Sequence, residues 1–281
     1  MTSATRRVLA TTLAALALLA SSRVAAAQAA PAPQAEAAQD LINPDRPGIA
    51  DGSKVIGAGR FQLETAIQEE YRDGAAKTHT LFIPTLVRIG VGERWEARVE
   101  GNTFTRVSTI GTDMTSAATS GFAPLSVGFK YAILDADHGR PSVGAIVRAF
   151  PASGSNDFKT EHFTADARLV ADWDVAPKFS LNPNVGFARY ESGGRTFGAF
   201  LFAFTLNYQP TDKLNPFVDV GYQHPSEPGG SGVAIFDAGV AYIVGRNVQL
   251  DVSLGSGNGD APQPFVAVGI SIRTGRATHH P

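Results

Sequence analysis

The chain has 281 residues, a formal net charge of −2 and no cysteine. A charge near zero disfavours nucleic-acid binding, which needs a basic excess, and the lack of cysteine excludes disulfide scaffolds, thiol nucleophiles and thiolate metal sites. With 43% hydrophobic and 18% charged residues, the chain is too apolar for disorder. Beyond the N-terminus no apolar run approaches the roughly 18 residues of a membrane-spanning helix, but a β-barrel in lipid would have this same composition.

The N-terminus has the pattern of a secretory signal peptide. Arg6 and Arg7 precede an apolar run from Val8 to Ala20, and small residues lead up to Ala27. This pattern predicts a signal peptide over residues 1–27 that is cleaved on export. The alternative is an uncleaved helix at a membrane interface.

Residues 28–58 have little that could form a core of their own. Residues 28–39 are rich in Ala, Pro and Gln, and residues 40–58 are polar and interrupted by Pro and Gly. We predict either a flexible periplasmic leader or a plug that folds into a barrel. In the second case Asp45, Arg46 and Pro47 could pair with inward charges such as Arg98 or Glu100.

From residue 59 onward, apolar and polar residues alternate with a period of two, which is typical of strands with one apolar and one polar face. The run after Phe61, for example, sets Leu63 and Ile67 against Gln62 and Glu64. The pattern predicts about twelve strands. They begin near Arg60, Thr80, Trp95, Pro124, Ser142, Phe163, Phe179, Phe197, Pro216, Ile235, Val248 and Phe265.

The predicted connections alternate between long polar loops and short turns. The stretch from Arg106 to Gly121 is the longest predicted loop, whereas Gly245 to Asn247 is a tight turn. Outer-membrane barrels have an even number of strands with short turns on the periplasmic side. We therefore predict an all-β fold, a transmembrane antiparallel up-and-down β-barrel over residues 59–273, followed by a polar tail over residues 274–281.

Aromatic residues on the apolar parity gather at both ends of the predicted strands. Such belts are typical of the two membrane interfaces, so we expect the apolar face to contact outer-membrane lipid; a soluble lipocalin-like barrel is the alternative. At the turn end the aromatics are Phe61, Trp95, Tyr131, Trp173, Phe179, Tyr208 and Tyr242, and at the loop end Tyr71, Phe163, Phe187, Phe200, Tyr222 and Phe236.

The opposite parity has a nearly balanced set of charges, which we predict to line the pore. A strongly selective ion pore would have one sign of charge, so pairing across strands and direct solute contact both remain open. Arg88, Arg98 and Lys130 would form a local basic constriction near the turn end. The acids are Glu64, Glu96, Glu100, Asp166, Asp172, Asp219, Asp237 and Asp251, and the bases are Arg88, Arg98, Lys130, Arg148, Arg168 and Arg189.

Motifs for catalysis or metal binding are missing from the sequence. There is no Gly-x-Ser-x-Gly elbow, phosphate loop or His-Glu-x-x-His helix. The run from Asp135 to Gly139 lacks most of the ligands of a calcium loop and is better interpreted as a tight turn. We predict no enzyme activity, no cofactor and no metal site. A barrel lipid hydrolase, assembled across strands, is a minor alternative.

Several strand motifs resemble the outer-membrane barrels grouped as the "meta-pathway of phenol degradation" family, often labelled transporter. The resemblance spans essentially the whole mature chain. Its segments are Asp45-Arg46-Pro47, Gly59 to Glu64, Pro84 to Gly90, Arg94 to Arg98, Leu125 to Tyr131, Phe236 to Tyr242 and Asn247 to Asp251. The resemblance implies an outer-membrane location and passage of small, including aromatic, compounds. Outer-membrane barrels usually end in an aromatic residue that the barrel-assembly machinery recognises, whereas here a polar tail follows Arg273.

We therefore expect a pore of the bacterial outer membrane that passes small aromatic or hydrophobic solutes without catalysis. Its expected partners are outer-membrane lipid, the barrel-assembly machinery and a small solute, with no nucleic acid. The alternative is a structural or surface-interaction barrel whose lumen is closed by ion pairs.

Overall fold

The computed structural model describes residues 40–74, 76–259 and 261–275. The predicted signal peptide, the first part of the predicted leader and the end of the polar tail lie outside these residues. The described residues form thirteen strands in one antiparallel sheet. No helix among them is long and apolar enough to cross a membrane.

The strands follow one another along the chain and begin close to the predicted positions, the largest difference being Lys77 in place of Thr80 for the second strand. They are β1 (Phe61–Asp73), β2 (Lys77–Gly90), β3 (Trp95–Ile110), β4 (Ser116–Gly121), β5 (Ser126–Leu134), β6 (Ser142–Phe150), β7 (Thr164–Ala176), β8 (Phe179–Ser192), β9 (Arg195–Tyr208), β10 (Leu214–His224), β11 (Val233–Gly245), β12 (Val248–Gly257) and β13 (Phe265–Thr274).

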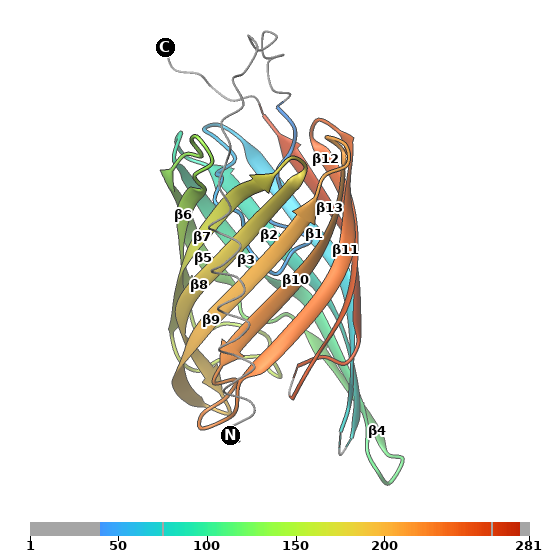
Figure 1. Cartoon of the computed structure of the whole chain (residues 1–281). Helices are drawn as coiled ribbons and strands as arrows, with labels where there is room; N and C mark the ends of the chain where they lie inside the picture. The colour runs from blue at the N-terminus through green and yellow to red at the C-terminus, as the bar shows by residue number, and fades with distance from the viewer. Residues whose placement is uncertain (1–39, 75, 260, 276–281) are drawn as a thin grey trace, which may run out of the picture. The chain divides into compact units, whose positions relative to one another are not determined.

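The sheet closes on itself because β1 pairs with both β2 and β13. The other strands pair with their neighbours in sequence, and β4 and β5 share one position, since both pair with β3. The result is a closed antiparallel barrel of twelve strands (Figure 1). The predicted fold class and strand number are confirmed.

The predicted loop from Arg106 to Gly121 is wrong in detail, because most of it is a β-hairpin. β3 continues to Ile110, and β4 pairs back onto it from Ile110↔Ser116 to Thr105↔Gly121. The hairpin extends beyond the ends of the other strands (Figure 1). Most of the side chains of β4 are exposed. A strand with no buried face needs no apolar alternation, so the sequence shows no strand pattern there.

The two faces of the wall differ in the way that the alternation predicts. Side chains of the outer parity, such as Phe187, Leu254 and Val268, are exposed apolar groups, whereas Gln62, Glu64 and Lys130 point inward and are fully buried. The inside of a twelve-stranded barrel is wider than that of an eight-stranded one, whose own wall side chains just fill it. Polar side chains and a further chain segment occupy this lumen.

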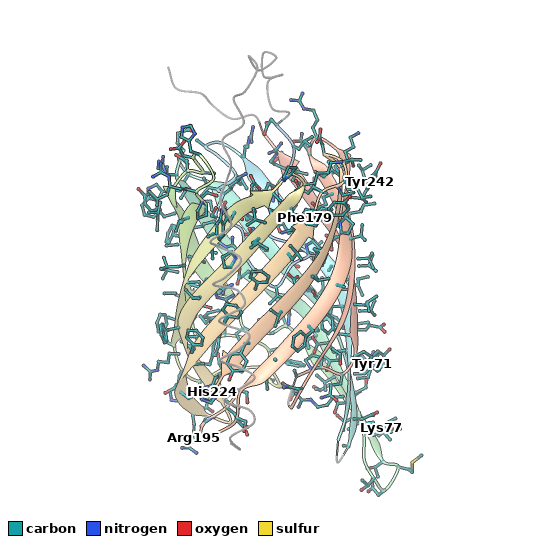
Figure 2. All side chains as sticks on the ribbon, viewed as in Figure 1. Tyr71, Lys77, Phe179, Arg195, His224 and Tyr242 are labelled. Atoms are coloured by element: carbon teal, nitrogen blue, oxygen red, sulfur yellow. The ribbon has the colours of Figure 1, made fainter. Side chains whose placement is uncertain are left out.

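The aromatic residues expected at the membrane interfaces lie on the outer parity and are exposed or half-exposed. At the turn end Trp95 packs on Tyr131, with ring centroids 4.3 Å apart, and Phe179 packs on Tyr208 at 4.8 Å. Phe179 and Tyr242 lie near one rim and Tyr71 near the other (Figure 2). Their contact with lipid headgroups remains a prediction.

If the outer face contacts lipid, the effect of a charge there should depend on depth. Val252 is an outward residue at mid-strand, paired with Val240 and Val268. We expect Val252→Arg to destabilise the barrel by ~2–4 kcal/mol in equilibrium unfolding from vesicles. The same substitution at Val244, near the turn end of β11, should cost only ~0–1 kcal/mol. Equal effects at the two depths would contradict a lipid-embedded wall.

Candidate functional site

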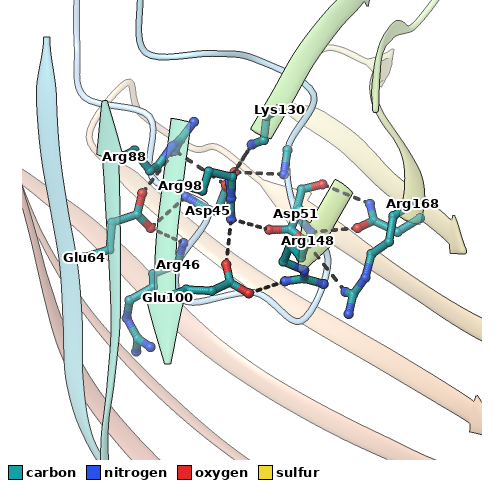
Figure 3. Close-up of polar contacts among 12 residues, drawn as sticks. Asp45, Arg46, Asp51, Glu64, Arg88, Arg98, Glu100, Lys130, Arg148 and Arg168 are labelled. Carbon is teal, nitrogen blue, oxygen red and sulfur yellow. Dashed lines mark hydrogen bonds and ion pairs between the residues drawn. The ribbon is translucent and has the colours of Figure 1, made fainter. Parts of the chain in front are cut away.

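Residues 40–58, here called the inner segment, pass through the lumen before the chain enters β1. They form no helix or strand, yet Ile42, Ala50, Ser53 and Ile56 are buried. Their contacts are with inward-facing side chains that come from strands around the barrel (Figures 1 and 3). The lumen and the inner segment together form the candidate functional site.

The inner segment has no secondary structure to satisfy its backbone N–H groups, and inward side chains accept their hydrogen bonds instead. A buried backbone donor without a partner is costly, so these acceptors fix the path of the segment. The bonds run from Asp45 N and Arg46 N to Glu64 Oε2 (3.0 and 2.9 Å), Ile49 N to Asp219 Oδ2 (3.0 Å), Asp51 N to Asn184 Oδ1 (2.8 Å), Ser53 N to Asp172 Oδ2 (3.0 Å) and Ile56 N to Glu96 Oε2 (3.1 Å).

Asp45 is the charged centre of the inner segment. Its carboxylate lies 2.7 Å from Lys130 Nζ and 3.6 Å from Arg88 Nη1, and it accepts a hydrogen bond from Arg98 Nη1 (Figure 3). The predicted pairing of this residue with Arg98 is therefore confirmed. Asp51 adds a second acid to the cluster, 3.1 Å from Arg98 Nη2.

Arg88, Arg98 and Lys130 converge as predicted, but acids surround them and they do not form an open basic constriction. Besides the contacts to Asp45, Arg88 binds Glu96 through two nitrogen atoms, at 2.8 and 2.9 Å, and Glu64 at 3.0 Å. The three cationic side chains are at most 2% exposed. We conclude that their charges are balanced within the cluster and hold the inner segment in place.

The carboxyls of the inner segment ionise more readily than usual. Burial alone would raise the pKa of Asp45, but the charges of Arg88, Lys130 and Arg98 lower this pKa well below its ordinary value. Burial likewise acts against ionisation of Asp51, and Arg98 reverses the effect, so its pKa is also lowered. Both residues therefore remain charged in the lumen at neutral pH.

A second group of ion pairs continues along the same side of the wall. Arg148 binds Asp166 through two nitrogen atoms, at 2.9 and 2.8 Å, and also contacts Glu100. Arg168 lies 3.4 Å from Asp166 and 3.7 Å from Asp51. Across the lumen, Asp251 of β12 pairs with Arg46 of the inner segment at 3.0 Å.

All the residues predicted to line the pore point inward except Arg189, for which the prediction is wrong. Arg189 is exposed and has the same parity as the outward Val185 and Phe187. Its Nη2 donates to Thr196 Oγ1 at the loop end of the barrel. Near a strand end both faces can reach water, so the charge of a residue does not identify the inner face there.

Three further inward residues, two of them uncharged, also hold the inner segment but are not among the residues predicted from the sequence. Asn184 forms two hydrogen bonds with the backbone of Asp51, accepting from its N at 2.8 Å and donating to its O at 2.9 Å. Gln249 Nε2 donates to Arg46 O at 3.1 Å. Arg273, at the end of β13, donates to Asp40 O at 2.8 Å. The inward parity of these polar side chains is the sequence signal that identifies them.

The inner segment divides the free space of the lumen. A cavity of about 300 Å³ on the turn side is lined by Asn182, Thr205 and Asn207 among others. On the loop side there are cavities of about 170 Å³, lined by Tyr190 and Leu201 among others, and about 220 Å³. Arg46, Pro47 and Gly48 border both the 300 Å³ and the 220 Å³ cavity. This stretch of the inner segment therefore separates the turn-side space from the loop-side space. Within the described residues, no group of three or more His, Asp or Glu side chains is arranged to hold a metal ion.

Removing the carboxylate of Asp45 should release the inner segment, because three cations would lose their shared partner. Breaking a buried ion pair by deleting one partner costs ~3–5 kcal/mol. We expect Asp45→Ala to accelerate tryptic cleavage after Lys54 by about 100-fold or more, if cleavage follows the open population. Asp135→Ala, which breaks an exposed pair with Arg94 at the turn end, is the control and should leave the rate unchanged. Slow cleavage in both variants would contradict an anchoring role for Asp45.

The lowered pKa of Asp45 predicts that mild acid does not protonate this residue. An acid with a depressed folded-state pKa contributes stability above its unfolded value of 3.8, and this is lost only as the pH falls through the lower folded value. Hydrogen-exchange protection of the Gly52 amide, which donates to Asp45 Oδ1 at 3.1 Å, should therefore be the same at pH 7 and at about pH 4.5, after correction for intrinsic exchange. Loss of protection at about pH 5 would contradict this pKa direction.

The sequence model of a family described as "Putative MetA-pathway of phenol degradation" matches residues 44–274. Among solved structures, an outer-membrane channel from Pseudomonas putida F1 is similar, with 12% identity and a TM-score of 0.63 over 83% of this chain and 100% of that one. The transport unit of the autotransporter AIDA-I from Escherichia coli has 11% identity and a TM-score of 0.50 over 77% of this chain and 90% of that one. No match to this sequence is found among curated proteins. At these identities the solved structures support the barrel fold, which is that of outer-membrane proteins. The match over residues 44–274 shows that the chain belongs to the family of the MetA-pathway of phenol degradation.

Proposed function

We propose that this protein is a passive pore of the bacterial outer membrane for small solutes, aromatic or hydrophobic ones among them, and that it acts without catalysis. In this proposal the chain is exported through a cleaved signal peptide before it enters the membrane. The observation that carries the proposal is the closed barrel with free space on both sides of one short irregular segment.

The half of the wall formed by β1 to β7 differs from the half formed by β8 to β12, and this difference suggests a route for a solute. Ion pairs of Asp45 and Asp51 with cations of β2, β3, β5 and β7 hold the inner segment against the first of these halves. The turn-side cavity lies largely along β8 to β12, where it is lined by amides and hydroxyls such as Asn182, Thr205 and Asn207. On the loop side, Leu201, Ile235 and Tyr190 give the 170 Å³ cavity an apolar lining. A small solute with an apolar body fits these two cavity linings, one polar and one apolar, better than a highly charged solute does.

A closed structural barrel remains the second candidate, because the buried ion pairs also close part of the lumen. The β3–β4 hairpin beyond the barrel rim would then be the surface that meets a partner (Figure 1). Swelling of vesicles that contain the purified protein separates the two functions, since only a pore admits small solutes. We expect swelling in the presence of small sugars and aromatic acids.

A disulfide can test whether the inner segment controls passage, since the native chain has no cysteine. Ser53 Oγ lies 2.8 Å from Ser142 Oγ of β6, so the pair Ser53→Cys and Ser142→Cys should form a bond when oxidised. If solutes pass only when the segment moves, oxidation should lower single-channel conductance in planar bilayers, and reduction should restore it. Each single variant is a control and should not respond to the redox state.

The double cysteine variant also shows whether the inner segment regulates passage by moving or stays in place as part of the pore lining. Equal conductance of the oxidised and reduced double variant would show that the segment does not need to move. Deleting residues 28–58 is the complementary test: conductance should rise if the segment narrows the pore, and unchanged conductance would contradict a plug.

A further inference from the structure

Two directly opposed acids of the lumen form no ion pair with a cation of the described residues. Asp237 of β11 lies directly opposite Asp219 of β10 in the antiparallel register. Asp237 is 8% exposed and Asp219 5% exposed, and the Oδ1 atom of each lacks a hydrogen-bond partner. Like charges at directly opposed positions of a sheet repel, and a buried charge without a partner is costly.

The two acids differ in what they do for the fold. Asp219 Oδ2 accepts a hydrogen bond from the backbone of Ile49 at 3.0 Å, so it helps to hold the inner segment. Within the described residues, Asp237 forms no hydrogen bond or ion pair with the inner segment or with a cation. Asp251, on the next strand, pairs with Arg46 at 3.0 Å. The anchoring of the inner segment therefore accounts for Asp219 and Asp251 but not for Asp237.

Asp237 borders the 220 Å³ cavity, here called the acidic cavity. Its wall includes Gln68, Glu70, Asp237, Ser253, Ile235 and Phe265, together with Arg46 to Ile49 of the inner segment. Glu70 adds a second carboxylate, which accepts a hydrogen bond from Gln68 at 2.9 Å and interacts electrostatically with Arg72. The one arginine on this wall, Arg46, is committed to Asp251. The cavity thus combines apolar surface with one carboxylate, that of Asp237, which has no ion pair within the described residues.

We propose that the acidic cavity binds a small organic ammonium, whose positive charge lies beside Asp237 and whose apolar body lies against Phe265 and Ile235. A primary ammonium has three donors, and the carboxylate of Asp237 and the hydroxyl of Ser253 are acceptors on adjacent strands. The cation would relieve the repulsion between the opposed acids. This inference rests on the proposed function, because the solute reaches the cavity through the pore.

Equilibrium binding of benzylammonium to the purified full-length barrel, followed by saturation-transfer NMR, tests the site. Benzyl alcohol is the neutral ligand of matched shape. We expect benzylammonium to bind at least about tenfold more tightly than benzyl alcohol, and Asp237→Asn to abolish that preference. Asp174→Asn removes the same group from the turn-side cavity and should leave the preference intact.

Asp219→Asn is the second variant in case Asp237→Asn does not fold, and it should also weaken the preference for the cation. Equal binding of the two ligands by the native protein, or an unchanged preference in Asp237→Asn, would overturn the inference. Conductance is measured on the same preparations. A barrel that conducts but does not prefer the ammonium contradicts only the site, and one that prefers the ammonium but does not conduct contradicts only the pore.

Discussion

The contact on which the rest of the lumen depends is that of Asp45 with Arg88, Arg98 and Lys130. Each of these cations is buried on the inner wall, and charges removed from water need partners. The wall supplies part of the balance through Glu64 and Glu96, and the inner segment supplies the rest. The segment is therefore a component of the wall's electrostatics, and removing it would leave buried charges exposed to one another.

The backbone of the inner segment adds a second constraint. A chain without helix or strand leaves its N–H groups unpaired, and here acceptors on β1, β3, β7, β8 and β10 take them up. Since these strands lie on opposite sides of the barrel, the segment has to cross the lumen to reach them all. Because the segment crosses the lumen, the turn side and the loop side have separate cavities. In a passive pore, the segment between these cavities would be the point that controls the passage of solutes.

The sequence predicts the wall much better than it predicts the lumen. Period-two alternation is local, so it locates the strands and separates Glu64 and Lys130 from outward residues such as Val252. It fails where that local pattern ends: Arg189 follows the parity of Phe187, although its charge suggested the interior, and β4 has no buried face to create a pattern. The path of the inner segment depends on partners far away in the sequence, such as Asp219 for Ile49, and no local pattern records them. Of the segment's contacts, the sequence indicates only that Asp45, Arg46 and Pro47 could pair with inward charges such as Arg98, because a charge that enters the lumen needs a partner there.

The structure also explains why acidic side chains outnumber basic ones on the inner face of the wall. With Arg189 outside, eight predicted inward acids face five predicted inward bases of the wall. This excess is not random, because Glu64, Glu96, Asp172 and Asp219 accept backbone N–H groups of the inner segment. A carboxylate that accepts such hydrogen bonds needs no cationic partner. Asp251 does have a cationic partner, which is Arg46 of the inner segment. Asp237 has neither role, and a buried carboxylate that neither holds the fold nor pairs with a charge is costly to keep. A cationic ligand is the physical reason that we infer for its position.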